Sequence, residues 1–211
     1  EGGGGGKEMC DDGLMDRWNI QEVYGMHNWP GMPTGSFGIR TGPFFAATDL
    51  LDIEVEGLGG HAAKPNETID TTVVAAHIVT ALQTIVSRNA DPIGHIVVSI
   101  TSFETSSKAF NVIPQRVTLK GTVRTMSTEM RDMAEKRIKA ICEAQTACFG
   151  GKAEVKYHRG YPVMINNEEQ TEFAAEVASA VSGGCEEAPL VMGGEDFAYM
   201  LEERPGAYIL V

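Results

Sequence analysis

The alternation of strand and helix patterns between Asp49 and Gly160 constrains the fold more than any other feature of this chain. Leu51, Ile53 and Val55 alternate with acidic residues, which is the period of a half-buried strand. Behind this strand, apolar residues recur at helical spacing from a start near Asp70, a residue that can cap a helix. The pattern therefore predicts a strand followed by an amphipathic helix.

The rest of this stretch completes a small mixed domain. It predicts strands at HIVVSITSF and RVTLKGTVRT, a helix from about Thr128 that the Gly150-Gly151 pair can end, and a strand at AEVKYHR. The order β-α-β-β-α-β is the split βαβ, or ferredoxin-like, arrangement. Residues 49–160 are therefore predicted to form a ferredoxin-like α+β domain.

Two flanks, 1–48 and 161–211, lie outside that domain. The first flank is expected to hold a glycine loop, a short helix around Lys7 to Trp18, a strand at EVYGM and a loop rich in Pro and Gly. The second predicts helices over Glu168 to Val181 and near Glu195 to Glu203, then an apolar terminal strand. Because strands alternate with helices, we expect the flanks to form part of an α/β domain that the ferredoxin-like domain interrupts. The chain opens without Met and closes on an apolar strand, so it is expected to be a piece of a longer protein.

The charge balance argues against two classes of partner. The 211 residues include 17 Lys and Arg against 29 Asp and Glu, a formal net charge of -12. Nucleic acids and anionic membranes both reward clustered Lys and Arg, so no nucleic acid and no membrane is expected as a partner. The four cysteines show no CxxC pairing, and no apolar run approaches the ~20 residues of a membrane span. A reducing, cytoplasmic location is therefore expected.

Two histidines stand in settings that suit chemistry. His27 follows an apolar strand in a proline-stiffened loop, a usual place for a ligand or catalytic side chain, although it could equally be a loop histidine bonded to backbone. His61 follows three glycines and precedes two alanines, so its side chain can reach outward; the alternative is a turn histidine with no task. His77 falls on the apolar stripe of its helix and is expected to be a core or interface residue.

Other polar residues suit ligand binding without proving it. Glu1 precedes five glycines, which either allow close approach to a ligand or form a flexible linker, and a carboxylate with one histidine is half of a divalent metal site. Asn111 and Arg124 carry donors that suit a carboxylate, although an exposed strand Arg is usually only solvated. Glu195 and Asp196 stand at an expected helix start, where acidic residues also complement the helix N-terminus.

Six segments carry a family likeness. EGGGGGKEM, YGMHNWPGMPTG, EGLGGHAAKP, AFNVIP, GTVRT and GGEDF, in this order and spacing, resemble the metal-dependent amidohydrolases and carboxypeptidases that include hippurate hydrolase, aminoacylase-type enzymes and plant hydrolases of indole-acetyl amino acids. The resemblance spans essentially all 211 residues. It implies a two-metal catalytic α/β domain interrupted by a ferredoxin-like lid that also forms a homodimer interface.

The resemblance also implies roles for single residues. Glu1 and His27 match metal ligands, and His61 matches a histidine that reaches from one subunit's lid into the partner's active site to stabilise the oxyanion. Asn111 and Arg124 match lid residues that hold the substrate carboxylate, and Glu195 is expected to join in substrate binding. The implied reaction is hydrolysis of an N-acyl amino acid by water that two divalent ions, zinc or manganese, activate.

Departures from the family leave a second class of function open. The family's upstream Cys and His ligands, its downstream His ligand and the general base before Glu1 have no counterpart in this chain. The chain as given is then, in the alternative, a non-catalytic dimerisation or binding module built on the ferredoxin-like unit. The fold cannot decide between the two, because such folds host many unrelated functions.

Overall fold

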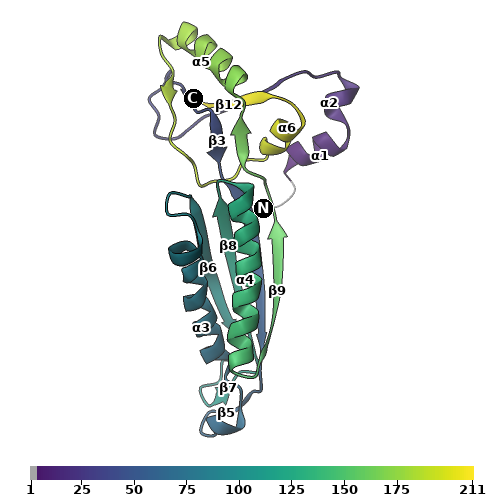
Figure 1. The fold of residues 1–211 in the computed structure, drawn as a ribbon, viewed down its shortest axis with the longest axis vertical. Helices are drawn as coiled ribbons and strands as arrows, with labels where there is room; N and C mark the ends of the chain where they lie inside the picture. Colours follow the sequence, from purple (N-terminus) through teal and green to yellow (C-terminus); the bar gives the residue numbers. More distant parts are fainter. Residues whose placement is uncertain (1–3) are drawn as a thin grey trace. The chain divides into compact units, whose positions relative to one another are not determined.

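A computed structural model describes residues 4–211 and divides the chain into two compact units. Unit 1 takes in the segments 1–48 and 160–211, and unit 2 is Asp49–Arg159, so unit 2 interrupts unit 1 in the sequence (Figure 1). The domain expected over 49–160 and unit 2 differ by one residue, Gly160. Glu1, an expected metal ligand, lies outside the described residues.

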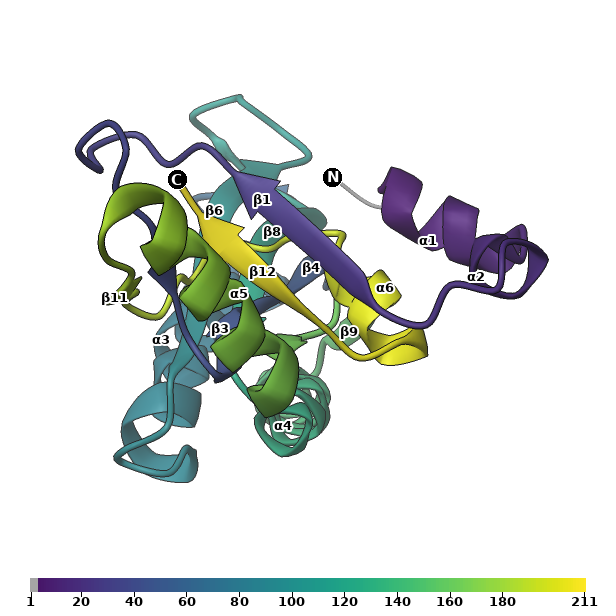
Figure 2. The same cartoon turned by 90° about the horizontal axis from the view of Figure 1, so that it is seen from above.

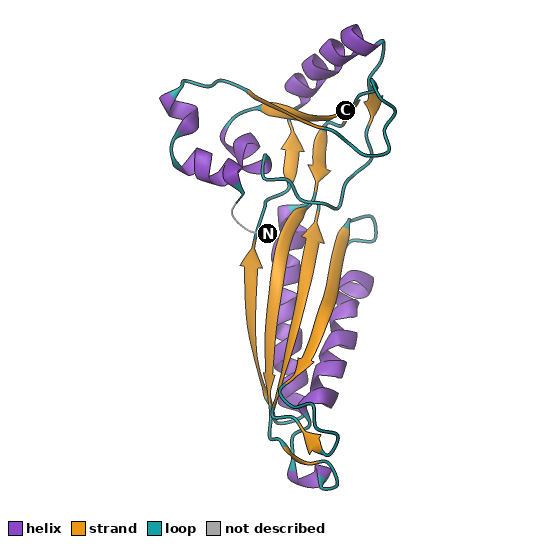
Figure 3. Ribbon diagram, turned by 180° about the vertical axis from the view of Figure 1, so that it is seen from behind, coloured by secondary structure: helices purple, strands orange, loops and turns teal. Residues whose placement is uncertain are grey.

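Unit 2 is built from four long strands and two helices. Its elements are β4 (Ala47–Glu56), β5 (Gly60–His61), the 3₁₀ helix η1 (Pro65–Glu67), α3 (Thr71–Thr84), the π-helical turn η2 (Ile85–Asn89), β6 (Ile96–Thr105), β7 (Val112–Ile113), β8 (Arg116–Thr125), α4 (Thr128–Cys148) and β9 (Lys152–Arg159). The long strands form one sheet in the order β6-β8-β4-β9. The pairs β6–β8 and β4–β9 are antiparallel. Both helices lie on the same face of the sheet (Figure 3).

One hydrophobic core lies between that sheet and the two helices. Ile53 of β4, Leu119 of β8, Ile78 of α3 and Ile138 of α4 are all fully buried in it. Alternate residues of β4 and β8 point into the core, because successive strand side chains face opposite sides of a sheet. The strand periods and the helices expected in this stretch are confirmed, including the cap of α3, where the Asp70 carboxylate accepts two backbone N–H groups.

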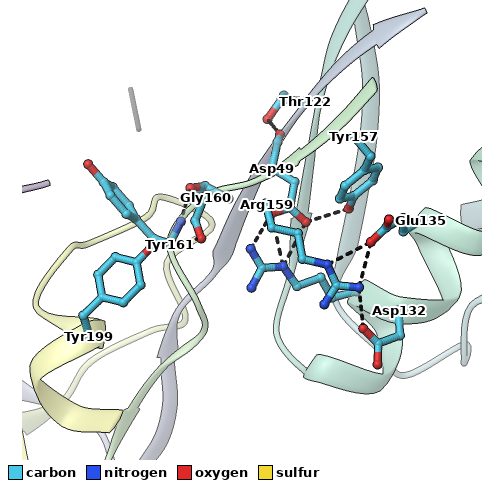
Figure 4. A network of polar contacts seen from close by, with 11 residues as sticks. Asp49, Thr122, Asp132, Glu135, Tyr157, Arg159, Gly160, Tyr161 and Tyr199 are labelled. Atoms are coloured by element: carbon cyan, nitrogen blue, oxygen red, sulfur yellow. Dashed lines mark hydrogen bonds and ion pairs between the residues drawn. The ribbon is translucent and has the colours of Figure 1, made fainter. Parts of the chain in front are cut away.

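A buried ion pair holds the first residue of unit 2 (Figure 4). The Asp49 carboxylate is 1% exposed and accepts from the Arg131 guanidinium, with Nε 3.0 Å from Oδ2. The Tyr157 hydroxyl donates to the same carboxylate at 2.6 Å. Burial, with the adjacent Asp49 carboxylate, raises the pKa of Tyr157, so this phenol stays protonated and keeps donating.

Arg159, the last residue of unit 2, is held by the same helix that supplies Arg131. Its guanidinium bonds Glu135 at 2.8 Å and Asp132 at 2.6 Å, both on α4 (Figure 4). Burial alone would raise the pKa of Glu135, but hydrogen bonds from Lys139 and Arg159 outweigh it and lower that pKa. The first turns of α4 therefore hold both ends of the unit 2 chain.

Unit 1 contains two sheets and several helices. Its elements are α1 (Gly5–Asp11), α2 (Leu14–Arg17), β1 (Val23–His27), β2 (Gly38–Ile39), β3 (Gly42–Phe45), β10 (Met164–Asn166), α5 (Glu168–Ser182), β11 (Glu186–Glu187), α6 (Ala198–Glu203) and β12 (Gly206–Leu210). One sheet has the order β1-β12-β2-β11, and β10 pairs with β3 in the other. β1 and β12 run parallel and side by side, and α5 packs on β12 (Figure 2).

Several local expectations were wrong. Gly5 and Gly6 belong to α1 rather than to a loop, and the single helix expected over Lys7 to Trp18 is two short ones. α6 begins at Ala198, three residues after Glu195. His77 is exposed and lies against the Phe149 ring at a centroid distance of 5.2 Å, so it is not in the core, and the alternative of an interface residue stays a prediction. Among the described residues, no helix has the length and apolar character needed to cross a membrane.

Candidate active-site residues

Loops at one end of unit 2 bring His61 and Asn111 together. β5 pairs with β7 so that His61 lies opposite Val112, and the Ala62 N–H donates to the Asn111 carbonyl at 2.9 Å. Both side chains are exposed. We call this end, comprising residues 57–64 and 107–113, the tip of unit 2; β5 and β7 mark it in Figure 1. Two candidate residues fifty positions apart thus share one surface.

A main-chain hydrogen bond fixes which ring nitrogen of His61 carries the proton. The Ala63 N–H donates to His61 Nδ1 at 3.1 Å, so Nδ1 is an acceptor. A neutral imidazole with an accepting Nδ1 carries its hydrogen on Nε2. The exposed face of His61 therefore offers an N–H donor, which is what a developing oxyanion requires.

Arg124 lies on β8, at the end of the four-stranded sheet that is far from the tip. It is half-buried near the end of β8, opposite Val97, while its strand neighbour Thr122 donates to the Asp49 carbonyl at 2.9 Å. Eight residue steps separate Arg116 from Arg124, roughly 26 Å at ~3.3 Å per residue. The structure therefore does not bring Arg124 to His61 or Asn111 within one copy of unit 2.

His27, the candidate metal ligand of unit 1, is the last residue of β1 and is exposed. Its Nδ1 lies 2.6 Å from the Asn28 carbonyl oxygen, and because a carbonyl only accepts, Nδ1 carries the hydrogen. Nε2 is then the basic nitrogen. Metal-bound histidines usually donate their other ring N–H to a carbonyl or carboxylate in this way, so His27 fits a metal ligand.

The glycine run packs against the GGEDF segment in unit 1. The Gly6 N–H donates to Asp196 Oδ2 at 2.9 Å, so the helix that Asp196 serves is α1 and not the expected α6. A Cβ on Gly4 would lie 2.3 Å from the same oxygen, and one on Gly6 would lie 2.7 Å from the Asp196 carbonyl oxygen. Glycine is required at both places by this close approach.

Glu195 is positioned by a tyrosine that sequence reasoning missed. Burial raises the pKa of Tyr208, and the negative charge of Glu195 and a hydrogen bond to it raise that pKa further. Tyr208 lies opposite Gly25 in the sheet, and a Cβ on Gly25 would lie 2.5 Å from the tyrosine ring. His27 shares the sheet face of Gly25, because strand side chains alternate. Glu195 and His27 thus belong to one face of the β1–β12 pair.

The described part of the chain does not by itself provide a complete metal centre. Within residues 4–211, no three or more His, Cys, Asp and Glu side chains are placed so that they could hold a metal ion together. His27 is the described residue whose local geometry fits a ligand. Its apolar strand and stiff loop signalled this position. The bond between Tyr208 and Glu195 joins distant segments, and the bond from Ala63 to His61 depends on the local backbone turn, so no side-chain pattern signalled either.

Comparison with known proteins shows which family this chain resembles. The profile of "Peptidase family M20/M25/M40" matches residues 1–211. The chain is 38% identical to N-acetyl-L-cysteine deacetylase of Bacillus subtilis over 208 residues, 99% of this chain and 49% of that protein. It is 38% identical to hippurate hydrolase of Campylobacter jejuni over 212 residues, 99% of this chain and 55% of that protein.

A solved structure gives the same picture. The fold matches a dinuclear metal binding peptidase of the M20 family from Bacillus subtilis with a TM-score of 0.81 and 29% identity, covering 98% of this chain and 51% of that one. The chain spans about half the length of the relatives it matches. The match over all 211 residues shows that this chain belongs to the peptidase family M20/M25/M40.

Proposed function

We propose that the whole protein is a homodimeric, metal-dependent amidohydrolase that cleaves the amide bond of N-acyl amino acids. Unit 2 would be its ferredoxin-like lid and dimerisation domain, and unit 1 part of its metal-binding catalytic domain. Support comes from the relatives named as an N-acetyl-L-cysteine deacetylase and a hippurate hydrolase. Both names describe removal of an acyl group from an amino acid.

The observation that carries this proposal is the pair of opposite histidine tautomers. His61 presents an N–H donor to solvent and His27 presents a basic nitrogen. The first suits an oxyanion that forms on the acyl carbon, and the second suits a cation. Each ring thus presents to solvent the nitrogen that its proposed task needs.

The separation of candidate residues supports a site shared by two copies. His61 and Asn111 lie at the tip of unit 2, and Arg124 lies roughly 26 Å away along β8. A small substrate cannot reach both ends of one unit. Two copies related by a two-fold axis with their sheets running in opposite directions would bring the tip of one beside the Arg124 end of the other.

Strand β6 supplies an edge suited to that pairing. It is an outer strand of the unit 2 sheet, and its residues 96–103, IVVSITSF, contain no charge. Val97 and Phe103 are 37% and 41% exposed. Unpaired edges usually carry charges or proline that prevent association, so an uncharged apolar edge favours pairing with a second strand. Antiparallel β6–β6 pairing in a homodimer gives the required reversal.

In this proposal each described residue has a defined task. His61 Nε2–H donates to the oxyanion, Asn111 and Arg124 hold the substrate carboxylate, and His27 Nε2 holds an ion while Asn28 fixes its ring. Glu1 would be a second ligand, and Glu195 would join substrate binding. Two zinc or manganese ions, when bound, would lower the pKa of water and polarise the acyl oxygen.

The test uses the whole protein with a panel of N-acyl amino acids. Hydrolysis should require added zinc or manganese and be abolished by chelation. His61→Ala should lower kcat by ~10²–10³ while metal content stays unchanged, since an oxyanion donor typically contributes that much. His61→Gln should retain more activity than His61→Asn, because the glutamine amide lies nearer the position of Nε2. Full activity in His61→Ala would remove the assigned role.

One observation favours the second candidate, a non-catalytic binding or dimerisation module, for the chain as given. Residues 4–211 contain no ready-made group of metal ligands. Metal analysis of the 211-residue chain, with an assay for hydrolysis, distinguishes the amidohydrolase from the non-catalytic module. Stoichiometric retention of a divalent ion together with hydrolysis of any N-acyl amino acid would exclude the module, whereas loss of both would favour it for this chain alone.

A further inference from the structure

An aromatic side chain stands fully exposed at the tip of unit 2. Phe110 has a relative exposure of 106%, the highest of the large apolar residues that the structure describes. It precedes Asn111, and two further apolar residues of the tip, Leu58 and Val112, are 53% and 41% exposed. Large exposed apolar groups clustered beside functional residues mark sites of contact. The tip therefore presents apolar side chains suited to a contact.

The main chain holds Phe110 in a defined place. The Val112 N–H donates to the Ala109 carbonyl at 3.3 Å, which makes Phe110 and Asn111 the two central residues of a tight turn. Hydrogen bonds on either side tie this turn down: the Ala109 N–H donates to the Ser107 hydroxyl, and the Ala62 N–H donates to Asn111. Side chains at the centre of a turn point away from it. Phe110 is thus displayed by a fixed backbone, next to the strand that carries His61.

We propose that Phe110 packs against the acyl group of the substrate and makes the enzyme favour large apolar acyl groups. This inference rests on the proposed function and adds a determinant of specificity to it. The substituent of an acyl group is bonded to the carbon that bears the oxyanion, so it lies two bonds from the oxygen that His61 would contact. An aromatic ring on the same tip is well placed to cover an apolar substituent there.

The experiment compares substrates that differ only in the acyl group. In the whole protein with metal, kcat/KM is measured for N-benzoylglycine and N-acetylglycine with wild type, Phe110→Ala and Phe110→Leu. Phe110→Ala should lower the benzoyl-to-acetyl ratio about three- to tenfold, the range of an aromatic contact, and Phe110→Leu should restore part of it. Val86→Ala, which truncates an exposed apolar side chain outside the tip, is the control and should leave the ratio unchanged.

Other outcomes overturn the proposal in distinguishable ways. An equal fall for both substrates with a weakened dimer would make Phe110 a contact between subunits. A change seen only between N-acetylglycine and N-acetylphenylalanine would place it against the amino acid side chain. An unchanged ratio in an active Phe110→Ala enzyme would remove any role in specificity. If the wild type hydrolyses none of these compounds, the proposed function fails first and this role fails with it.

Discussion

Unit 2 closes its own hydrophobic core, whereas unit 1 does not. In unit 2 the sheet and two helices bury one continuous cluster, with Leu51, Leu82 and Ile138 at its centre. Unit 1 divides its buried apolar residues between two smaller clusters, one around Phe44 and one around Ile39. A groove of about 440 Å³ between α5 and the β1–β12 pair leaves apolar side chains exposed. Unit 2 therefore has one continuous core, whereas unit 1 has two smaller ones and leaves an apolar groove open.

The two units differ in net charge as well as in packing. Unit 2 has 13 Lys and Arg and 13 Asp and Glu, whereas unit 1 has 4 and 16. The whole formal charge of -12 therefore belongs to unit 1. Self-repulsion opposes a compact state, so the unit with the weaker core also has the less favourable electrostatics. The negative charge of unit 1 would also favour binding of divalent cations there.

Expressing each unit on its own should show the largest difference between them, in cooperative unfolding. Residues 49–159 expressed alone should fold and unfold in one cooperative thermal transition, because their core needs no other residues. Residues 1–48 joined to 160–211 by a short linker should show no cooperative transition. Circular dichroism and calorimetry of the two proteins measure this. A cooperative unit 1 and an unfolded unit 2 would reverse the comparison.

Breaking the buried ion pair tests what holds unit 2 together. Asp49→Asn removes the charge of the carboxylate that the buried Arg131 guanidinium contacts, and it should lower the free energy of unfolding by about 3–5 kcal/mol. Asp52→Asn on the same strand is the control: Asp52 pairs with exposed His158 at 3.5 Å and should cost at most ~1 kcal/mol. Equal costs for the two variants, measured by urea unfolding, would show that burial of Asp49 adds nothing.

Replacing Glu135 should have a smaller effect on the free energy of unfolding, and that effect should depend on pH. The pKa of Glu135 is lower in the folded protein than its ordinary value, so its ionised form stabilises unit 2 above the unfolded pKa and this contribution is lost as pH falls through the folded pKa. Glu135→Gln should cost about 0.5–1 kcal/mol at pH 7, and this cost should shrink as the pH falls toward 3. Urea unfolding of wild type and variant at both pH values measures this. A cost that persists at pH 3 would mean that packing, not charge, explains it.

Local sequence patterns were enough to predict the long strands and helices. The period of two in β4 even places Asp49 on the core face with Leu51 and Ile53, although the sequence could not name Arg131, 82 residues away, as the group that makes this burial tolerable. The two-residue strands β5 and β7 were missed because they carry no period. Their pairing is nevertheless what joins His61 to Asn111.

The candidate site was predictable in its members but not in its geometry. Motifs named His27 and His61, yet the opposite tautomers follow from the Asn28 carbonyl and the Ala63 N–H, which are backbone groups that no side-chain pattern reveals. The motif AFNVIP pointed to Asn111 and not to Phe110. Only its exposure on a fixed turn gave it a role.

The central claim, that the tip of one copy completes the site of another, is tested most directly by mixing two inactive variants of the whole protein. His61→Ala subunits keep His27, and His27→Ala subunits keep His61. After subunit exchange at equal amounts, each mixed dimer should hold one intact site, restoring about a quarter of wild-type activity. Activity no higher than that of the separate variants, with exchange verified by native mass spectrometry, would contradict the account.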